Sequence, residues 1–269
     1  MTNHQSPTTE NRLPNTDRRR WVLVVGATSG IARALVRELA RHNFSLILAA
    51  RDGEEMETIA ADLRVRAKAE IKILHFEATT TGFVREKNDV AFWNEALEMC
   101  SGELHGLVLC HAIMPEQELA ARDWKTSRAM IEANYASYVS LLNLSAAYFE
   151  NRADGFIAAI GSVAGDRGRK GNYIYGSTKA ALSVLMQGVR QRLAQTGVSV
   201  ITIKPGPIDT AMTFGMEKLP LLVPPERVAR DILRAIRQKK EIVYTPAPWR
   251  IIMTLLCLVP ENFWKKMKF

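Results

Sequence analysis

Seven short apolar runs recur along the chain, and a longer segment compatible with helical spacing separates each from the next. The runs, which lie between residues 21 and 244, are WVLVV, FSLILAA, IKILHF, LHGLVLC, GFIAAI, VSVITI and EIVY. Their apolar residues are continuous rather than alternating, which is typical of strands buried on both faces. Strands that alternate with helices favour a parallel sheet. The pattern therefore predicts an α/β fold with a seven-stranded parallel sheet wound on both sides.

The chain divides into three parts by composition. Residues 1–20 are rich in Thr, Asn, Pro and Arg and lack apolar periodicity, which predicts a flexible basic arm. Residues 21–245 contain no boundary rich in Pro, Gly or Ser, which indicates a single domain, although residues 209–225 have too little periodicity to assign. Residues 246–269 predict an amphipathic extension, and Pro260 should divide it into two short helical pieces.

Composition narrows the class of protein. The chain has 36 Lys and Arg against 28 Asp and Glu, a formal net charge of +8, with 47% hydrophobic and 24% charged residues. These values exclude a wholly disordered or collagen-like chain. Three scattered cysteines are too few for a disulfide framework or a four-ligand zinc site, so we expect no metal and a reducing compartment. The cations are spread over the arm, a loop and the tail without a nucleic-acid-binding motif, which argues against nucleic acid as a partner.

Targeting signals are not evident from the pattern. Residues 1–17 lack the apolar core of a signal peptide. The longest apolar stretch, residues 251–259, is about half the ~20 residues that a membrane-spanning helix needs. We therefore expect a cytoplasmic protein.

A turn of small residues follows the first apolar run and precedes a segment with helical spacing. A strand, a tight turn and a helix N-terminus form a phosphate site, because free N–H groups and the helix dipole face the anion. Any tight turn selects glycine, so a plain turn remains an alternative. As a nucleotide site, the turn brings these residues to the cofactor: Gly26, Thr28, Ser29, Gly30 and Ile31.

The end of the second apolar run bears on the choice of cofactor. Enzymes that use NAD place a carboxylate there to bind the ribose 2′-hydroxyl, whereas a 2′-phosphate needs a cation. Here the run ends at Ala50 and is followed by Arg51, whose guanidinium suits a phosphate. NADP(H) is therefore the preferred cofactor, with NAD(H) as the second choice. The alternative is that Arg51 lies in solvent beside Asp52.

Candidate chemistry follows the fifth run. Ser162 lies thirteen residues before Tyr175, and Tyr175 and Lys179 are four residues apart, so they project from one face of a helix. A phenol has a pKa of about 10, and a neighbouring ammonium would lower it toward the working range of an acid. Ser162 would donate to a carbonyl oxygen as that oxygen gains negative charge. A chance pair on an exposed helix is the alternative.

These motifs together resemble the short-chain dehydrogenase/reductase family over residues 21–245. The resemblance rests on Gly26-x-x-x-Gly30-x-Ala32, Asn134, Ser162, Tyr175-x-x-x-Lys179 and Pro205-Gly-Pro-Ile-Asp-Thr210. It implies a Rossmann fold and an NAD(P)-dependent interconversion of alcohol and ketone. The implied catalytic tetrad is Asn134, Ser162, Tyr175 and Lys179.

The family's known contacts extend the list of expected site residues. In such enzymes the lysine also holds the nicotinamide ribose, the asparagine anchors a water of a proton relay, and the turn after the sixth strand contacts the nicotinamide. The resemblance thereby assigns to the cofactor Ala112, Tyr175, Lys179, Pro205, Gly206, Ile208 and Thr210. It also implies a homo-dimer or homo-tetramer formed through the helices that contain Asn134 and Tyr175.

Two departures from the family pattern are visible. The family's Asn-Asn-Ala-Gly after the fourth strand is Cys110-His111-Ala112-Ile113 here, and the usual Asp near the adenine is replaced by Glu77. We interpret His111 as a structural substitute for asparagine rather than a catalytic acid, and Cys110 as a small buried residue.

Two longer segments are similar to a branch of the family that reduces a polyprenyl-phosphoryl 2-keto-ribose. They are IGSVAGDRGRKGNYIYGSTKAAL and YTPAPWRIIMTLLCLVPENFWKKMKF. This similarity implies a lipid-linked sugar substrate, a flavin-dependent oxidase as partner, and a role in making the arabinose donor for cell-envelope glycans. The alternatives are another hydrophobic ketone, acyl or steroid-like, and a non-catalytic dinucleotide-binding protein.

Two further segments fit a lipid phosphate. The loop between Ser162 and Tyr175 contains Arg167 and Arg169, whose guanidinium groups would pair with a phosphodiester, although a solvated basic loop is the alternative. Residues 248–269 combine apolar and aromatic side chains with flanking cations, which suits a segment at the inner membrane surface. A core or dimer-packing extension is the alternative for this tail.

Overall fold

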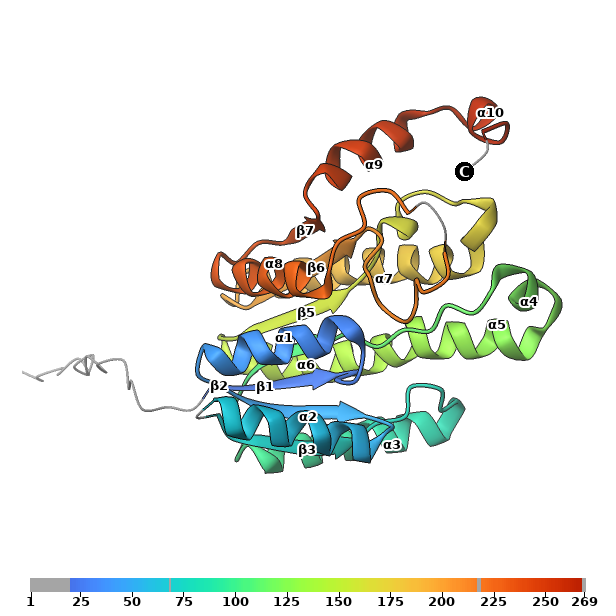
Figure 1. Ribbon diagram of the computed structural model, residues 1–269. Helices are drawn as coiled ribbons and strands as arrows, with labels where there is room; N and C mark the ends of the chain where they lie inside the picture. Colours follow the sequence, from blue (N-terminus) through green and yellow to red (C-terminus); the bar gives the residue numbers. More distant parts are fainter. Residues whose placement is uncertain (1–19, 68, 217–218, 268–269) are drawn as a thin grey trace, which may run out of the picture.

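The computed structural model describes residues 20–67, 69–216 and 219–267 (Figure 1). The arm predicted for residues 1–20 lies outside the described residues, except for Arg20. In the described parts, helices and strands alternate along the chain, as the pattern of apolar runs predicts.

One seven-stranded sheet, parallel throughout, forms the centre of the molecule. Its order is β3-β2-β1-β4-β5-β6-β7. The strands are β1 (Arg20–Val25), β2 (Phe44–Ala50), β3 (Ile71–His75), β4 (Leu104–Leu109), β5 (Phe156–Ile160), β6 (Ser199–Pro205) and β7 (Ile242–Thr245). The predicted Rossmann-type sheet with seven parallel strands is confirmed.

Helices cover both faces of this sheet (Figure 1). On one face lie α1 (Gly30–Arg41), α2 (Gly53–Arg66) and α8 (Pro225–Arg237), and on the other lie α3 (Gly82–Met99), α6 (Ser137–Arg152) and α7 (Tyr173–Arg192). The short helices α4 (Gln117–Arg122) and α5 (Trp124–Ile131) lead into α6 through a π-helical turn, Glu132–Ala136.

Strand β1 shows why the apolar runs are continuous. Val22 and Val24 pack in the core under α1, α2 and α8, whereas Leu23 and Val25 pack in the core under α3, α6 and α7. Successive side chains of a strand point to opposite faces, so a strand covered on both sides has no position left for a polar residue.

The strand order reverses between β1 and its neighbours β2 and β4. In open α/β sheets a crevice forms outside the carboxyl ends of the strands at such a reversal, and ligands bind there. The loops after β1, β4, β5 and β6 all end at this crevice.

The C-terminal extension follows the edge strand β7. It forms α9 (Pro248–Leu258) and α10 (Glu261–Trp264), which are separated at Pro260 as predicted. Trp249 and Met253 of α9 are buried against Val163 in the loop after β5. Across the described ranges, no helix is long and apolar enough to cross a membrane.

Candidate active site

A cavity of about 620 Å³ opens at the carboxyl ends of the central strands. It runs from the N-terminus of α1 to the first turn of α7. Most of the residues predicted from the sequence line it, namely Thr28, Ser29, Gly30, Ile31, Ala112, Ser162, Arg169, Tyr175, Lys179, Pro205, Gly206, Ile208 and Thr210. Among the described residues, four predicted ones stand outside this lining: Gly26, Arg51, Asn134 and Arg167.

The turn after β1 is held by close approaches that only glycine permits. Gly26 has a φ of +81°, and a Cβ built there would lie 2.5 Å from the backbone nitrogen of His111. A Cβ at Gly30 would lie 2.7 Å from Cγ2 of Thr210. Ser29 caps α1, because its Oγ accepts a hydrogen bond from the backbone N–H of Ala32 at 3.4 Å. The helix N-terminus is thereby fixed against both neighbouring loops.

Ser162 and Tyr175 come together because the turn after β5 packs directly on α7. A Cβ at Gly165 would lie 2.6 Å from the carbonyl carbon of Lys179, and one at Gly176 would lie 2.8 Å from the carbonyl oxygen of Ala164. Two glycines therefore set the distance between the loop and the helix. In the sequence these glycines lie three residues after Ser162 and directly after Tyr175, a signal that the catalytic motifs do not include.

Burial is the main influence on the pKa values of Tyr175 and Lys179. It raises the pKa of Tyr175 from 10.0 to about 12, and a hydrogen bond with the side chain of Ser162 acts in the lowering direction. Burial also lowers the pKa of Lys179 from 10.5 to about 7. The ammonium of Lys179 donates to the carbonyl oxygen of Ile160 at 2.9 Å. The sequence predicts that Lys179 lowers the phenol pKa, but desolvation raises it, and among the described residues the opposing contribution comes from Ser162. Tyr175 is therefore fully protonated at neutral pH.

Asn134 lies in the π-helical turn before α6 and is fully buried. Its Oδ1 accepts from the N–H of Ile113, and its Nδ2 donates to the carbonyl oxygen of Ile113, both at 2.8 Å. The Nδ2 also contacts Oγ1 of Thr178, on α7, at 3.4 Å. π-helical turns inside α-helices occur often at functional sites. Here the turn lets one amide hold the loop after β4 against the helix that carries Tyr175.

The departure after β4, which brings in Cys110 and His111, has a structural role. Nε2 of His111 lies 2.8 Å from Oγ of Ser137, and the ring packs 4.4 Å from that of Tyr138 between centroids. Burial lowers the pKa of His111 from 6.5 to about 3, so the ring is neutral at physiological pH and is no acid. Burial raises the pKa of the Cys110 thiol to about 12, which makes it unreactive.

The arrangement fits a nicotinamide dinucleotide. The N-terminus of α1 lines one end of the cavity with Thr28, Ser29, Gly30 and Ile31, and free backbone N–H groups at a helix N-terminus suit a phosphate. At the other end, the bond to Ile160 uses only one of the three N–H groups of the Lys179 ammonium, and ribose hydroxyls are suitable acceptors for the others.

Arg51 lies beside the substituted acid. Its Nε is 4.0 Å from Oε2 of Glu77, and its side chain is 65% exposed. Burial acts to raise the pKa of Glu77, but hydrogen bonds from Thr79 and the charges of Arg51 and His75 outweigh it, so the pKa lies below its ordinary value. Glu77 is therefore ionised and loosely paired with Arg51, which leaves that guanidinium open to a second anion.

The sequence predicts that Arg51 contacts the 2′-phosphate of NADPH, and a charge-assisted bond of this kind is worth about 1.5–3 kcal/mol. Arg51→Ala is therefore expected to raise KM for NADPH by about 10- to 100-fold. KM for NADH should change little, since the 2′-hydroxyl carries no charge. Initial rates with each cofactor measure this, with Arg41→Ala at the far end of α1 as the control. Equal changes in KM for the two cofactors would contradict this role for Arg51.

Arg167 and Arg169 separate in the structure. Arg169 lines the cavity, and burial lowers the pKa of its guanidinium. Arg167 is turned to the tail, where it donates to the carbonyl oxygen of Val259 at 3.0 Å and to Oε2 of Glu261 at 2.9 Å. Its guanidinium also lies 4.9 Å from the ring centroid of Trp264. The prediction that both arginines face the substrate is therefore retained for Arg169 alone.

The loop after Ser162 is clamped on two sides. Asp166 accepts from Nζ of Lys204 at 2.5 Å and from the hydroxyl of Tyr244 at 2.8 Å, so the end of the sheet holds one side. The tail holds the other, because the indole N–H of Trp264 donates to the carbonyl oxygen of Gly168 at 2.8 Å. The loop that follows Ser162 is thus attached to both the β-strands and the tail.

The tail also supplies part of the cavity wall, which the sequence did not reveal. Trp249 lines the cavity, and a Cβ built at Gly206 would lie 1.9 Å from its Nε1. Gly206 therefore has to lack a side chain for the tail to dock. The stretch 209–225, whose sequence pattern predicts no element, adds an apolar lining from Met212, Met216 and Leu219.

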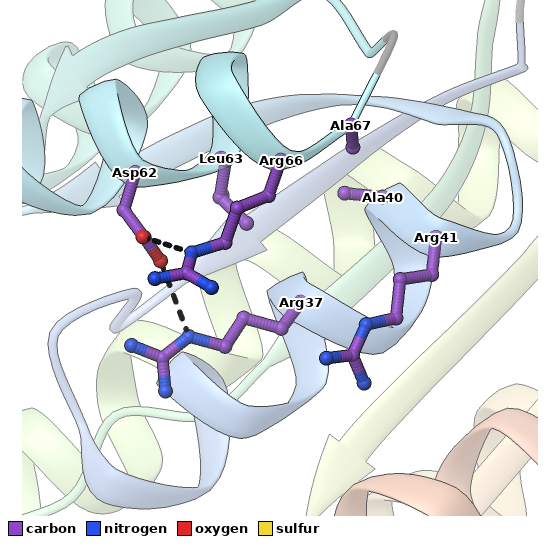
Figure 2. Close-up of a pocket in the computed structure, with 7 residues that line it drawn as sticks. All are labelled: Arg37, Ala40, Arg41, Asp62, Leu63, Arg66 and Ala67. Atoms are coloured by element: carbon purple, nitrogen blue, oxygen red, sulfur yellow. Dashed lines mark hydrogen bonds and ion pairs between the residues drawn. The ribbon is translucent and has the colours of Figure 1, made fainter.

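A second, smaller pocket of about 290 Å³ lies between α1 and α2 (Figure 2). Its arginines are already paired with acids. Asp62 contacts Nε of Arg37 at 3.5 Å and also Nε of Arg66, while Arg41 bonds Glu38 at 3.1 Å. The hydrogen bond with Arg66 keeps the pKa of Asp62 below its ordinary value. This pocket is an ion-pair cluster that joins two helices, and we assign the chemistry to the larger cavity.

An oxidoreductase that uses a nicotinamide dinucleotide accounts for both ends of that cavity. The sequence model for the short chain dehydrogenase family matches residues 20–218. An uncharacterized oxidoreductase of Mycobacterium tuberculosis is 33% identical over 250 residues, which cover 91% of this chain and 96% of the relative. The chain belongs to the short-chain dehydrogenase/reductase family.

Solved structures agree on the fold. A short-chain dehydrogenase from Sphingobium yanoikuyae in complex with NADPH superposes with a TM-score of 0.76 at 21% identity, covering 93% of this chain and 96% of that chain. A bulky-bulky ketone specific alcohol dehydrogenase from Comamonas testosteroni gives a TM-score of 0.75 at 21% identity, with the same coverage of both chains.

Proposed function

We propose that the protein is an NADPH-dependent reductase of a large, hydrophobic ketone. The observation that carries this proposal is the placement of Ser162 and Tyr175 in the wall of one cavity that continues to the N-terminus of α1. NADPH, when bound, supplies a hydride to the carbonyl carbon. Tyr175 transfers its proton to the carbonyl oxygen, and Ser162 donates a hydrogen bond to that oxygen as its negative charge grows.

The residues around this pair have supporting roles in the proposal. Lys179 holds the ribose. When its amine is protonated, the positive charge also stabilises the phenolate that Tyr175 becomes after it gives up its proton. Asn134 acts as a positioning residue, because both of its amide bonds go to Ile113 in the loop after β4. The preference for NADPH rests on Arg51, and it is supported by the NADPH bound to the Sphingobium relative.

For the substrate we propose a polyprenyl-phosphoryl 2-keto-pentose, the class that decaprenylphosphoryl-2-keto-ribose reductase converts to the arabinose epimer. Arg169 supports this class, since it brings a cation with a buried, unpartnered Nε to the cavity wall. The methionines and leucine of the loop after β6 offer an apolar path for a lipid chain. Another bulky ketone is the second candidate, favoured by the name of the Comamonas relative.

The experiment that separates these candidates follows NADPH oxidation by its absorbance. Purified protein is given the keto-sugar lipid, made in place by a flavin-dependent oxidase, or an apolar ketone without phosphate. Turnover of the lipid-linked sugar supports the first class. Turnover of the apolar ketone alone keeps the reductase and discards the sugar.

Arg169→Ala is expected to raise KM for the phosphorylated substrate by about 10- to 100-fold, because a buried guanidinium–phosphate contact is lost. KM for a neutral ketone should stay within about twofold of the wild-type value. Lys170→Ala is the matched control, since this neighbouring cation is exposed and stands outside the described lining of the cavity. Equal changes for both substrates would remove the phosphate contact from the proposal.

The proposal extends to partners and location. The flavin-dependent oxidase would produce the ketone that this reductase consumes, at the cytoplasmic face of the membrane. We also propose a homo-dimer or homo-tetramer that pairs α6 and α7 across subunits. Measuring the mass of the protein in solution tests the oligomer, and a monomer at working concentration would exclude it.

A further inference from the structure

Helix α9 is apolar on two opposite sides, and the protein covers only one of them. Trp249 and Met253 face inward and are buried. On the opposite side, three residues at spacings of four and three are largely exposed: Ile251 at 68%, Leu255 at 61% and Leu258 at 73%. A helix that is apolar all round is normally covered all round, by protein or by membrane. Within the described residues, nothing covers the apolar outer side of α9.

Two further large apolar side chains, outside α9, are also exposed. Phe263 on α10 is 67% exposed, and Phe214, in the loop after β6, is 90% exposed. The tail and this loop both border the active-site cavity, the tail through Trp249 and the loop through Met212. We call Ile251, Leu255, Leu258 and Phe263 the outer tail face. The outer tail face therefore belongs to the same segment that contributes Trp249 to the cavity wall.

Cations accompany this face. Arg250, Lys265 and Lys266 are exposed within the tail. Glu261 is the one acidic residue among residues 248–267, and its carboxylate is paired with Arg167 at 2.9 Å. The outer tail face is thus apolar with a net positive border, which is the pattern of a segment that lies in the interface of an anionic bilayer.

The mode of contact follows from how the tail is held. Arg167 and Trp264 bind it to the loop after Ser162, so α9 lies along the body of the protein. Its 11 residues are too few to span a bilayer, where about 20 are needed. Both facts point to a helix that lies flat on a surface.

We propose that the outer tail face docks on an anionic lipid bilayer and thereby brings the active-site cavity to the membrane from which a lipid-linked ketone enters. The choice of substrate rests on the proposed function, whereas the docking itself rests on the exposed side chains and their charge. A second copy of this chain is the competing occupant of the same face, and the experiment distinguishes the two.

The test measures flotation of the full chain with vesicles of phosphatidylcholine containing about one third phosphatidylglycerol. The wild type should float, and the variant Ile251→Ser, Leu255→Ser, Leu258→Ser should lose about a hundredfold in partition constant. The control replaces three exposed valines of α2 and α3, at the opposite edge of the sheet, and should float as the wild type does: Val65→Ser, Val84→Ser and Val90→Ser.

A charge variant tests whether the cations of the tail contribute to binding of anionic lipid. Lys265→Glu with Lys266→Glu should weaken binding to the anionic vesicles by tenfold or more, on the order of fivefold per removed cation, and should reduce the dependence on salt. Binding that is equally tight to pure phosphatidylcholine would overturn the role of anionic lipid.

Other outcomes separate the docking from the reductase. Wild-type protein that fails to float, or a serine variant that floats unchanged, overturns the docking. So does a wild-type dimer that dissociates in the serine variant while no vesicle is bound. Turnover of a small soluble ketone without vesicles should be equal in both proteins, since the three replaced side chains point away from the cavity; vesicle binding without any ketone turnover would keep the docking and discard the proposed function.

Discussion

Tyr175→Phe is expected to lower kcat for ketone reduction by about 10³-fold, because a positioned general acid contributes ~10²–10⁴. The ring fills the same volume, so the buried packing around it is kept. The phenol has the right protonation for an acid, since burial raises its pKa to about 12. Ser162 and the bound cofactor remain in the variant, and they account for the residual rate.

The measurement is kcat from NADPH oxidation, together with the dissociation constant of NADPH from fluorescence titration. The dissociation constant should change little, because the lost hydroxyl serves the carbonyl oxygen. Tyr173→Phe is the matched control: this tyrosine opens the same helix but is 49% exposed and stands outside the described cavity lining. A Tyr175→Phe enzyme with a rate near that of the wild type would assign the proton to another group.

Lys179→Met is expected to stabilise the cofactor-free protein at pH 6 by several kcal/mol, on the order of 3–5, while activity is lost. The ammonium is 1% exposed and has a pKa lowered by burial to about 7, against 10.5 for an ordinary lysine. Below pH 7 both the folded and unfolded chains carry the proton, so folding bears the full cost of a buried charge. Methionine has a similar length and no charge to bury.

The pH dependence of this gain has a definite direction. Between pH 7 and 10.5 the unfolded wild-type chain keeps the proton of Lys179 and the folded protein releases it, so the wild type gains stability as the pH rises. The advantage of the methionine variant therefore shrinks through this range and ends near pH 10.5.

Urea unfolding of both proteins at pH 6 and pH 9 measures the difference. Lys204→Met is the contrasting control, because Lys204 is also buried but is paired with Asp166 at 2.5 Å. Its removal leaves a carboxylate without its cation, which destabilises the fold. A loss of stability at pH 6 in Lys179→Met would mean that the contacts of the ammonium in the folded protein outweigh the cost of burying its charge.

Buried charges are normally paired with an opposite charge, and these two lysines differ in this respect. Lys204 is buried with a carboxylate, whereas Lys179 is buried with a single carbonyl acceptor, that of Ile160. A charge held without a counter-ion costs stability and is retained where it has a catalytic use.

The sequence predicted the sheet because each strand is covered on both sides, as β1 shows with Val22 on one face and Leu23 on the other. It also predicted that residues as distant as Thr28 and Tyr175 would share a cavity, since the loops after parallel strands meet at one edge. The family motifs supplied the other cavity residues that the sequence predicted.

The contacts of the tail were beyond prediction for a physical reason. Arg167 bonds Glu261, which is 94 positions away, and neither residue belongs to a periodic pattern that would point to the other. A basic loop looks the same in sequence whether its arginine meets a phosphate or a carboxylate of the same chain. The pKa of Tyr175 was likewise misjudged, because spacing on a helix places Lys179 near the phenol but says nothing of the water excluded from both.

The docking of Trp249 against Gly206 has a consequence for how this enzyme can diversify. The family match ends at residue 218, whereas Trp249 lies in the segment after the last strand and still forms part of the cavity wall. Exchange of the terminal segment between homologous genes would therefore reshape the substrate cavity while every strand and the Ser162–Tyr175 pair stay in place. Chimeras joined after β7 would be an economical route to new ketone specificities on this scaffold.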